Sequence, residues 1–130
     1  MFFHKSYPTL EKKINKRINL FLSELKNNSD LSEFIDVFGI TGPAARGQAV
    51  KDMSDIDFYC ITTKLAPFKS IKLRNKFINF FKDIPVEVEL LIFSPRIYKK
   101  PDLMHYEFVN GGKILYGKIN KKIKLEKIPK

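Results

Sequence analysis

The sequence predicts an α/β (α+β) domain in which helices cover a small mixed β-sheet. Its length of 130 residues suits one compact domain. Hydrophobic residues make up 44% of the chain and include 12 Phe, which supplies a core and excludes a disordered protein. Segments with helical spacing alternate with short runs of β-branched and aromatic residues. That alternation is typical of a sheet covered by helices.

The first half of the chain contains one long helix and two strands. Apolar residues recur at helical spacing over residues 8–26, and the turn-forming residues 27–30 should end this helix. Residues 34–41 are β-branched and aromatic and run into Gly-Pro, which predicts a strand ending at a turn. The next strand is expected over residues 55–61, after a turn that contains Gly, Ala and Arg.

The second half repeats this alternation. Pro67 is a suitable first-turn residue for a helix over 67–82, whose apolar face we expect in the core. A strand should follow over 86–93, then a short helix near 101–110. A brief strand over 113–116 completes the predicted domain. The order is helix, strand, turn, strand, helix, strand, helix, strand.

These elements place the domain in residues 1–117 and leave residues 118–130 as a basic C-terminal tail. The tail mixes six lysines with four apolar residues, so its pattern fits either a docked segment or a mobile extension. The single cysteine, Cys60, cannot form an internal disulfide, which favours a reducing compartment. No apolar run approaches the length of a membrane span or a signal peptide, so we expect a cytoplasmic protein without a membrane partner.

Charge is distributed unevenly along the chain. The net charge is +10, yet residues 28–63 carry −4 between flanking segments of +4 (1–27) and +6 (64–82). This pattern indicates carboxylates gathered inside a basic frame, as in a cation site approached by an anion. An ordinary lysine-rich surface is the simpler alternative. The basic helix over 69–82 is the best candidate for a nucleic-acid surface, although nucleic acid is the less favoured partner.

Two aspartates carry the most specific chemical signal. Asp55 and Asp57 are separated by one residue on a predicted strand, so their carboxylates project from the same face. Two like charges side by side repel each other, and a hard divalent cation with oxygen ligands relieves that repulsion. The alternative is an acid pair that only decorates an edge strand. Glu87 and Glu89 share one face of a later strand and are the candidates for a third carboxylate.

The turn before the aspartates suits phosphate binding. Gly42 ends a strand where backbone amides can approach phosphate oxygens without obstruction, and Arg46 follows closely. A metal site beside a phosphate site suits phosphoryl or nucleotidyl transfer. A surface ion pair is the alternative role for Arg46.

The sequence resembles the minimal nucleotidyltransferase family of the DNA polymerase beta-like superfamily. The matching residues are Gly42, the Ala-Arg-Gly turn at 45–47, Ser-Asp-Ile-Asp-Phe at 54–58, Ile-Pro-Val at 84–86 and the Gly-to-Tyr strand at 112–116. The resemblance covers about residues 8–117 and is most specific over 42–58. It implies the nucleotidyltransferase fold.

The resemblance also implies site residues and a cofactor. Asp55, Asp57 and Glu87, with Glu89 as the alternative, would act in catalysis and bind two Mg²⁺ ions. The nucleotide-binding residues would be Gly42, Pro43, Arg46 and Ser54.

The chain departs from the family at two positions. Pro43 replaces the family's Ser and removes a hydroxyl and a backbone donor. The third carboxylate is a Glu where family members more often have Asp.

The implied function is metal-dependent transfer of an NMP from an NTP, with ATP the first choice, to a hydroxyl of a protein or small molecule. In this family such domains often work as the antitoxin-like half of a pair with a small helical HEPN-type protein, so such a partner, or a homodimer, is expected. The alternative, favoured by Pro43, is a weakened or inactive nucleotidyltransferase-fold module that binds a protein partner, nucleotide or RNA.

Overall fold

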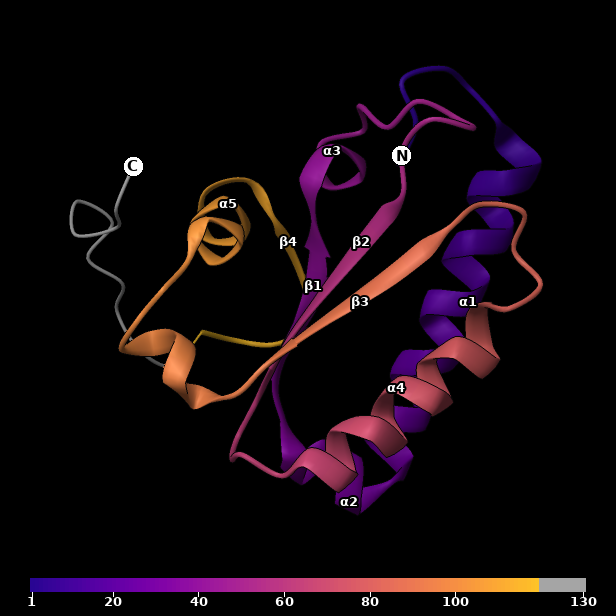
Figure 1. Cartoon of the computed structure of the whole chain (residues 1–130). Coiled ribbons are helices and arrows are strands. Elements are labelled where there is room, and N and C mark those ends of the chain that lie inside the picture. Colours follow the sequence, from indigo (N-terminus) through magenta and orange to yellow (C-terminus); the bar gives the residue numbers. More distant parts are fainter. Residues whose placement is uncertain (120–130) are drawn as a thin grey trace.

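The computed structural model describes residues 1–119 of the chain (Figure 1). The elements in chain order are α1 (Pro8–Asn27), α2 (Ser29–Phe34), β1 (Ile35–Thr41), α3 (Gly42–Ala45), β2 (Ile56–Thr62), α4 (Pro67–Phe81), β3 (Val88–Phe93), the 3-10 helix η1 (Pro95–Tyr98), α5 (Leu103–Gly111) and β4 (Lys113–Gly117).

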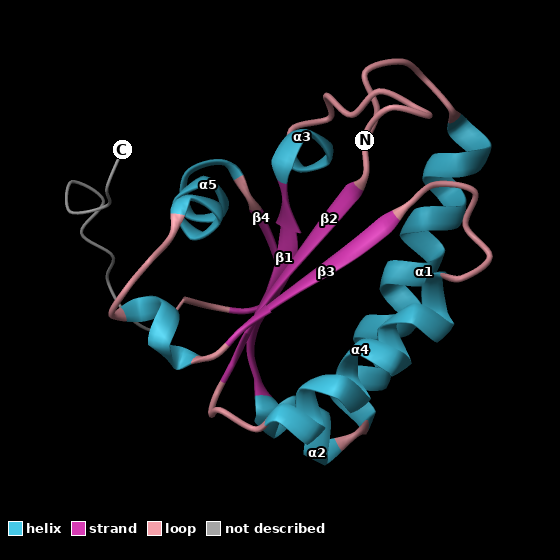
Figure 2. Cartoon of the chain, viewed as in Figure 1, coloured by secondary structure: helices cyan, strands magenta, loops and turns pink. Residues whose placement is uncertain are grey.

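The four strands form one mixed sheet in the order β3-β2-β1-β4 (Figure 2). β1 and β2 are the inner strands; β1 runs antiparallel to both β2 and β4, whereas β2 and β3 are parallel. A parallel pair needs a crossover connection, and α4 supplies it between β2 and β3. The predicted small mixed sheet covered by helices is therefore confirmed.

Helices α1, α2 and α4 cover one face of the sheet, and α5 and η1 lie on the other (Figure 1). The larger core lies under α1 and α4 and is dominated by phenylalanine. The ring centroid of Phe21 on α1 lies 5.2 Å from that of Phe38 on β1 and 5.5 Å from that of Phe77 on α4. Phe77 and Phe81 are buried and Phe80 is partly buried, as expected, whereas Ile71 and Ile78, which were expected on the same buried face, are exposed.

A smaller core lies on the opposite face of the sheet. Its buried residues are Val37, Tyr59, Ile61, Ile97 and Phe108. The ring of Phe108 on α5 stacks on that of Tyr59 with centroids 4.2 Å apart. This packing requires a glycine at position 39, because a β-carbon there would lie only 2.7 Å from Phe108 Cε1. The second core thus fixes α5 against the face of β2 that also carries Asp57.

Two local predictions were wrong, and one short element was not predicted. Residues 29–34 form helix α2 rather than a turn and the start of a strand, because the Asn28 Oδ1 accepts a hydrogen bond from the Leu31 amide at 3.3 Å and caps a new helix. η1 was not predicted; the Ser94 Oγ caps it through the Arg96 amide. β3 begins at Val88 rather than at residue 86.

Within residues 1–119, no helix is long and apolar enough to cross a membrane. Ile119 packs against the smaller core. The remainder of the predicted tail, residues 120–130, lies outside the described residues.

Candidate functional site

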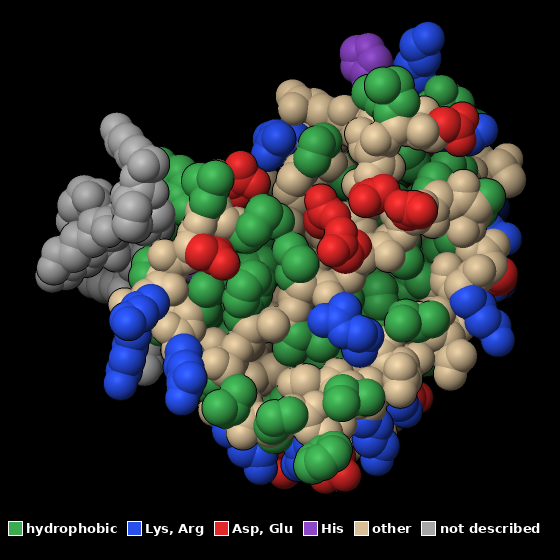
Figure 3. Space-filling model, viewed as in Figure 1, with side chains coloured by type: hydrophobic (Ala, Val, Ile, Leu, Met, Phe, Trp, Pro, Cys, Tyr) green, Lys and Arg blue, Asp and Glu red, His purple; other side chains and the backbone are tan. Residues whose placement is uncertain are grey.

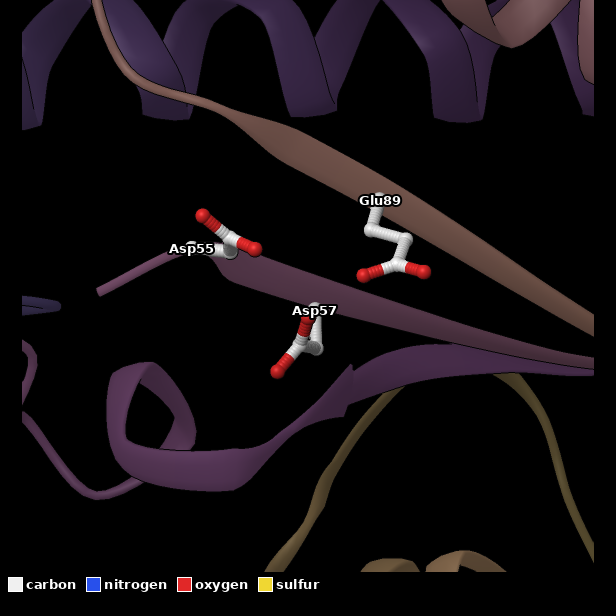
Figure 4. Close-up of side chains that lie close together, drawn as sticks. All are labelled: Asp55, Asp57 and Glu89. Atoms are coloured by element: carbon white, nitrogen blue, oxygen red, sulfur yellow. The ribbon is translucent and has the colours of Figure 1, made fainter. Parts of the chain in front are cut away.

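Three carboxylates meet at one end of the sheet. Asp55 directly precedes β2, Asp57 lies on it, and Glu89 lies on the neighbouring strand β3 (Figure 4). Asp57 and Glu89 are direct partners in the parallel register, so their side chains share a face. One oxygen from each of the three carboxylates lies within 4.8 Å of the others. The predicted pairing of Asp55 and Asp57 on one face is therefore part of a three-carboxylate cluster.

Glu89, the second choice from the sequence, is the third member of this cluster. The first choice, Glu87, is not a member of the cluster. The main-chain carbonyl of Glu87 accepts a hydrogen bond from the Ile56 amide at 2.9 Å, and its exposed side chain lines a pocket of about 420 Å³ together with Asp55. Both glutamates share a strand face, and the β2–β3 register is what sets Glu89 beside Asp57.

The cluster is electrostatically uncompensated. None of the ion pairs among residues 1–119 involves Asp55, Asp57 or Glu89. Burial, reinforced by the negative charges of Glu89, Asp55 and Glu107, raises the pKa of Asp57 from 3.8 to about 6. A divalent cation would relieve this repulsion, and three closely spaced carboxylates are the hard oxygen donors that such an ion prefers. The donor set therefore fits a divalent metal.

The turn after β1 lies directly against Asp57. Gly42 has a φ of +72°, and a β-carbon at this position would lie 3.2 Å from the Asp57 Oδ2. A glycine therefore serves both the left-handed backbone conformation and the close approach to the carboxylate. The half-buried Pro43 follows in α3, and its carbonyl accepts hydrogen bonds from the Arg46 and Gln48 amides. The predicted phosphate turn and the carboxylates are thus neighbours.

Arg46 is exposed, and its guanidinium lies beside α5. A β-carbon on Gly111 would lie 3.3 Å from the Arg46 Nη1, and the Arg46 Nε donates to the Gln48 Oε1 at 3.3 Å. Arg46 forms no ion pair among residues 1–119, so the surface ion-pair alternative finds no support there.

Ser54 closes the loop before β2. Its Oγ accepts a hydrogen bond from the Val50 amide at 3.1 Å, and its own amide donates to the Val50 carbonyl at 2.8 Å. The loop between them includes Asp52, which adopts a φ of 68°. In this structure the Ser54 hydroxyl supports the loop that delivers Asp55.

Sequence reasoning missed two residues near the cluster. Thr41 pairs with Asp57 across β1 and β2, and its buried Oγ1 has no hydrogen-bond partner among residues 1–119. Glu107 on α5 adds negative charge that contributes to the raised pKa of Asp57. The position of Thr41 before Gly42 was a usable signal, whereas no spacing in the sequence links Glu107 to the aspartates.

Comparison with known proteins identifies the fold. No family model matches the chain, and no curated protein matches it. A solved mutant of the toxin–antitoxin pair MntA–HpeT contains a chain with a TM-score of 0.53 and 16% identity, over 78% of this chain and 73% of that one. A second mutant has a TM-score of 0.49 and 20% identity, over 77% and 72% of the two chains. The MntA–HepT pair itself gives 0.48 and 17%, over 80% and 73%.

The structural similarity to the first of these chains confirms the fold class. At 16% identity it supports the fold and nothing more specific. The chain has a nucleotidyltransferase fold, with a mixed four-stranded sheet between two groups of helices.

Proposed function

We propose that this protein is a divalent-metal-dependent nucleotidyltransferase that transfers an NMP from an NTP to a hydroxyl group of an acceptor. The observation that carries this proposal is the cluster of Asp55, Asp57 and Glu89 beside the Gly42 turn. No Lys or Arg forms an ion pair with the cluster among residues 1–119, so a bound cation would relieve the repulsion that helps to raise the pKa of Asp57. The resemblance of residues 42–58 to minimal nucleotidyltransferases supports the same reaction.

Asp55, Asp57 and Glu89 would hold Mg²⁺, with two ions expected as in related enzymes. When bound, the metal neutralises the triphosphate and lowers the pKa of the attacking hydroxyl. The acceptor oxygen forms a bond to the α-phosphorus, the bond from that phosphorus to the pyrophosphate oxygen breaks, and Glu89 accepts the hydroxyl proton. Gly42 and Arg46 would contact the triphosphate, while Ser54 positions Asp55 through the loop. Glu87 lines the adjoining pocket and is proposed as an acceptor-side residue.

The proposed biological setting is a two-protein pair. The similar solved structures are described as toxin–antitoxin pairs. We infer that this chain is the antitoxin-like member, with a HEPN-type helical protein as partner and a hydroxyl of that partner as one candidate acceptor. ATP is the first NTP to test. The cytoplasm is the proposed location, since it supplies Mg-ATP and keeps a lone thiol such as Cys60 reduced.

Calorimetric titration with Mg²⁺ and each NTP tests the proposal. An Asp55→Asn, Asp57→Asn double variant should lose Mg-NTP binding. The matched control, Asp30→Asn with Glu33→Gln, neutralises two exposed acids on α2 and should bind as the wild type does. Equal binding by the wild type and the Asp55/Asp57 variant would overturn the catalytic proposal.

Label transfer tests the reaction itself. Incubation with ATP labelled at the α-phosphate should label a co-expressed HEPN-type protein when the wild type is present, and the double variant should leave it unlabelled. Label on neither sample, despite Mg-NTP binding, would favour the second candidate function.

That second candidate is a nucleotidyltransferase-fold module that binds without catalysis, and Pro43 is the observation that favours it. Pro43 offers no backbone N–H and no hydroxyl to a phosphate. A Pro43→Ser variant regains both donors, so Mg-ATP should bind about five-fold more tightly if the turn contacts the triphosphate. Unchanged affinity in calorimetry would show that the turn does not contact it.

A further inference from the structure

Helix α4 exposes a row of large apolar side chains that no described element covers. The exposed fractions are 87% for Phe68, 57% for Ile71 and 51% for Ile78, and Leu65, just before the helix, is 62% exposed. Phe68, Ile71, Asn75 and Ile78 are three or four residues apart and so form one line along the outer face of the helix. We call Leu65, Phe68, Ile71 and Ile78 the α4 row.

The opposite face of the same helix accounts for its packing. Leu73, Phe77 and Phe81 are buried in the larger core. The α4 row is therefore not needed to hold α4 on the sheet. Grouped apolar exposure of this kind on a small domain marks an interaction surface rather than a stability feature.

Basic side chains border the α4 row, and no acid lies within residues 64–82. On one side lie Lys69, Lys72 and Lys76, which line a small pocket against α2. Of these, only Lys76 is in an ion pair among residues 1–119, with Glu24. On the other side Arg74 donates to the Leu90 carbonyl of β3 at 2.6 Å. Asp30 of α2 lines the same pocket, so the three lysines outnumber the two acids, Asp30 and Glu24, at this margin. The surface is apolar along its middle and carries a net positive charge at its margins.

The charges beside the α4 row favour one kind of binding partner over the others. A second copy docked through the same row would place two positive margins against each other. A nucleic acid would pair with the lysines but would leave Phe68 and Ile71 without apolar contacts. A different protein, apolar in the centre and acidic at its rim, satisfies both parts of the surface.

We propose that the α4 row is the docking surface for a protein partner whose contact face is apolar in the middle and rimmed by Asp or Glu. The identification of that partner with the helical HEPN-type protein rests on the proposed function. Hydrophobic side chains over α4 and the carboxylates at the sheet end are visible from the same side of the molecule (Figure 3). A partner seated on the row can thus extend toward the cluster without crossing to the far face.

Two helical peptides with identical leucine faces test the proposal, one with Glu and the other with Lys beside those leucines. Each is titrated into the isotope-labelled full chain and followed by NMR. The Glu peptide should bind about ten-fold more tightly than the Lys peptide and shift the amide signals of α4. Equal affinity, no binding by either peptide, or shifts confined to other elements would overturn the proposal.

Variants of the row separate docking from folding and from catalysis. Phe68→Ser and Ile71→Ser should each weaken binding of the Glu peptide about ten-fold, because central apolar contacts dominate such interfaces. Leu20→Ser, which changes an apolar residue of α1 with 41% exposure, is the matched control and should bind normally. Both α4 variants should retain Mg-NTP binding, whereas Asp55→Asn with Asp57→Asn should retain peptide binding.

The other occupants give distinct results. Self-association in sedimentation that Ile78→Lys abolishes would assign the row to a second copy. Displacement of the Glu peptide by single-stranded RNA, together with RNA binding that weakens steeply with salt, would assign the surface to nucleic acid. Either result would overturn the protein-partner proposal, and neither depends on whether the cluster binds Mg-NTP.

Discussion

At the scale of single residues, Asp57 connects the stability of the protein to its proposed metal. Its raised pKa means that the folded state disfavours the ionised carboxylate relative to the unfolded chain. In the metal-free protein, the contribution of Asp57 to stability should therefore be highest below the unfolded value near 3.8 and decrease as pH rises through about 6. Asp57→Asn removes this penalty and should stabilise the metal-free protein at pH 8 by about 1 kcal/mol, allowing for partial solvent screening.

Urea unfolding at a series of pH values measures this effect, with Asp30→Asn as the exposed control. Mg²⁺ should reverse the trend for the wild type, because the ion binds the ionised cluster and its affinity increases as pH rises through about 6. If Mg²⁺ does not shift the unfolding curve of the wild type at pH 8, the metal assignment is contradicted.

The two glutamates of the β3 region offer a matched pair of variants. Glu89 belongs to the three-carboxylate cluster and Glu87 does not. Glu89→Gln should weaken Mg²⁺ binding by about ten-fold or more, since one charged ligand is lost, whereas Glu87→Gln should change it by about two-fold at most. Calorimetric titration with Mg²⁺ distinguishes the two, and the reverse ranking would restore Glu87 as the third ligand.

At the scale of elements, α5 is attached to the sheet by a buried histidine. His105 is hydrogen-bonded through Nδ1 to the Tyr59 hydroxyl, and its Nε2 has no partner among residues 1–119. Burial lowers the pKa of His105 from 6.5, with the charge of Asp102 opposing the shift. As pH falls below 6.5, His105 is protonated in the unfolded chain but stays neutral in the folded chain. The unfolded state is thereby favoured, and the protein loses stability.

The corresponding variant is His105→Phe in an Asp57→Asn background, where the opposing titration of Asp57 is absent. Between pH 7 and 5 the parent should lose up to about 1.4 kcal/mol of unfolding free energy per pH unit, and the His105→Phe chain should lose much less. Parallel slopes in chemical unfolding would show that His105 does not titrate in this range.

The elements with a strong periodic pattern were predictable. The long helix and the strands follow from apolar spacing, which burial of one face enforces. Helix α2 was not predictable, because Asn28 and Ser29 suit a turn and a helix cap equally well. Only the contact of Leu31 with the core decides between the two. The register between β2 and β3 also could not be predicted from the sequence. Spacing places Glu87 and Glu89 on one face, but strand pairing selects the one that reaches Asp57.

At the scale of the whole molecule, Phe21 connects the helices to the sheet. Its ring contacts Phe38 on β1 as well as Phe77, Phe80 and Phe81 on α4. Phe21→Ala should reduce the unfolding free energy by about 3–5 kcal/mol, because the cavity lies where α1, α4 and the sheet meet. Urea unfolding followed by circular dichroism checks this, and Leu20→Ala, on the neighbouring exposed position, should cost less than about 1 kcal/mol.

The hydrogen bond from Arg74 to Leu90 lies at an edge of the sheet. β3 is an edge strand, and an edge with unpaired backbone groups recruits strands of other molecules into aggregates. The Arg74 guanidinium donates a hydrogen bond to one of those carbonyls, that of Leu90, and places a positive charge beside the edge. We therefore expect Arg74, which borders the α4 row, to oppose the addition of strands from other molecules at this edge.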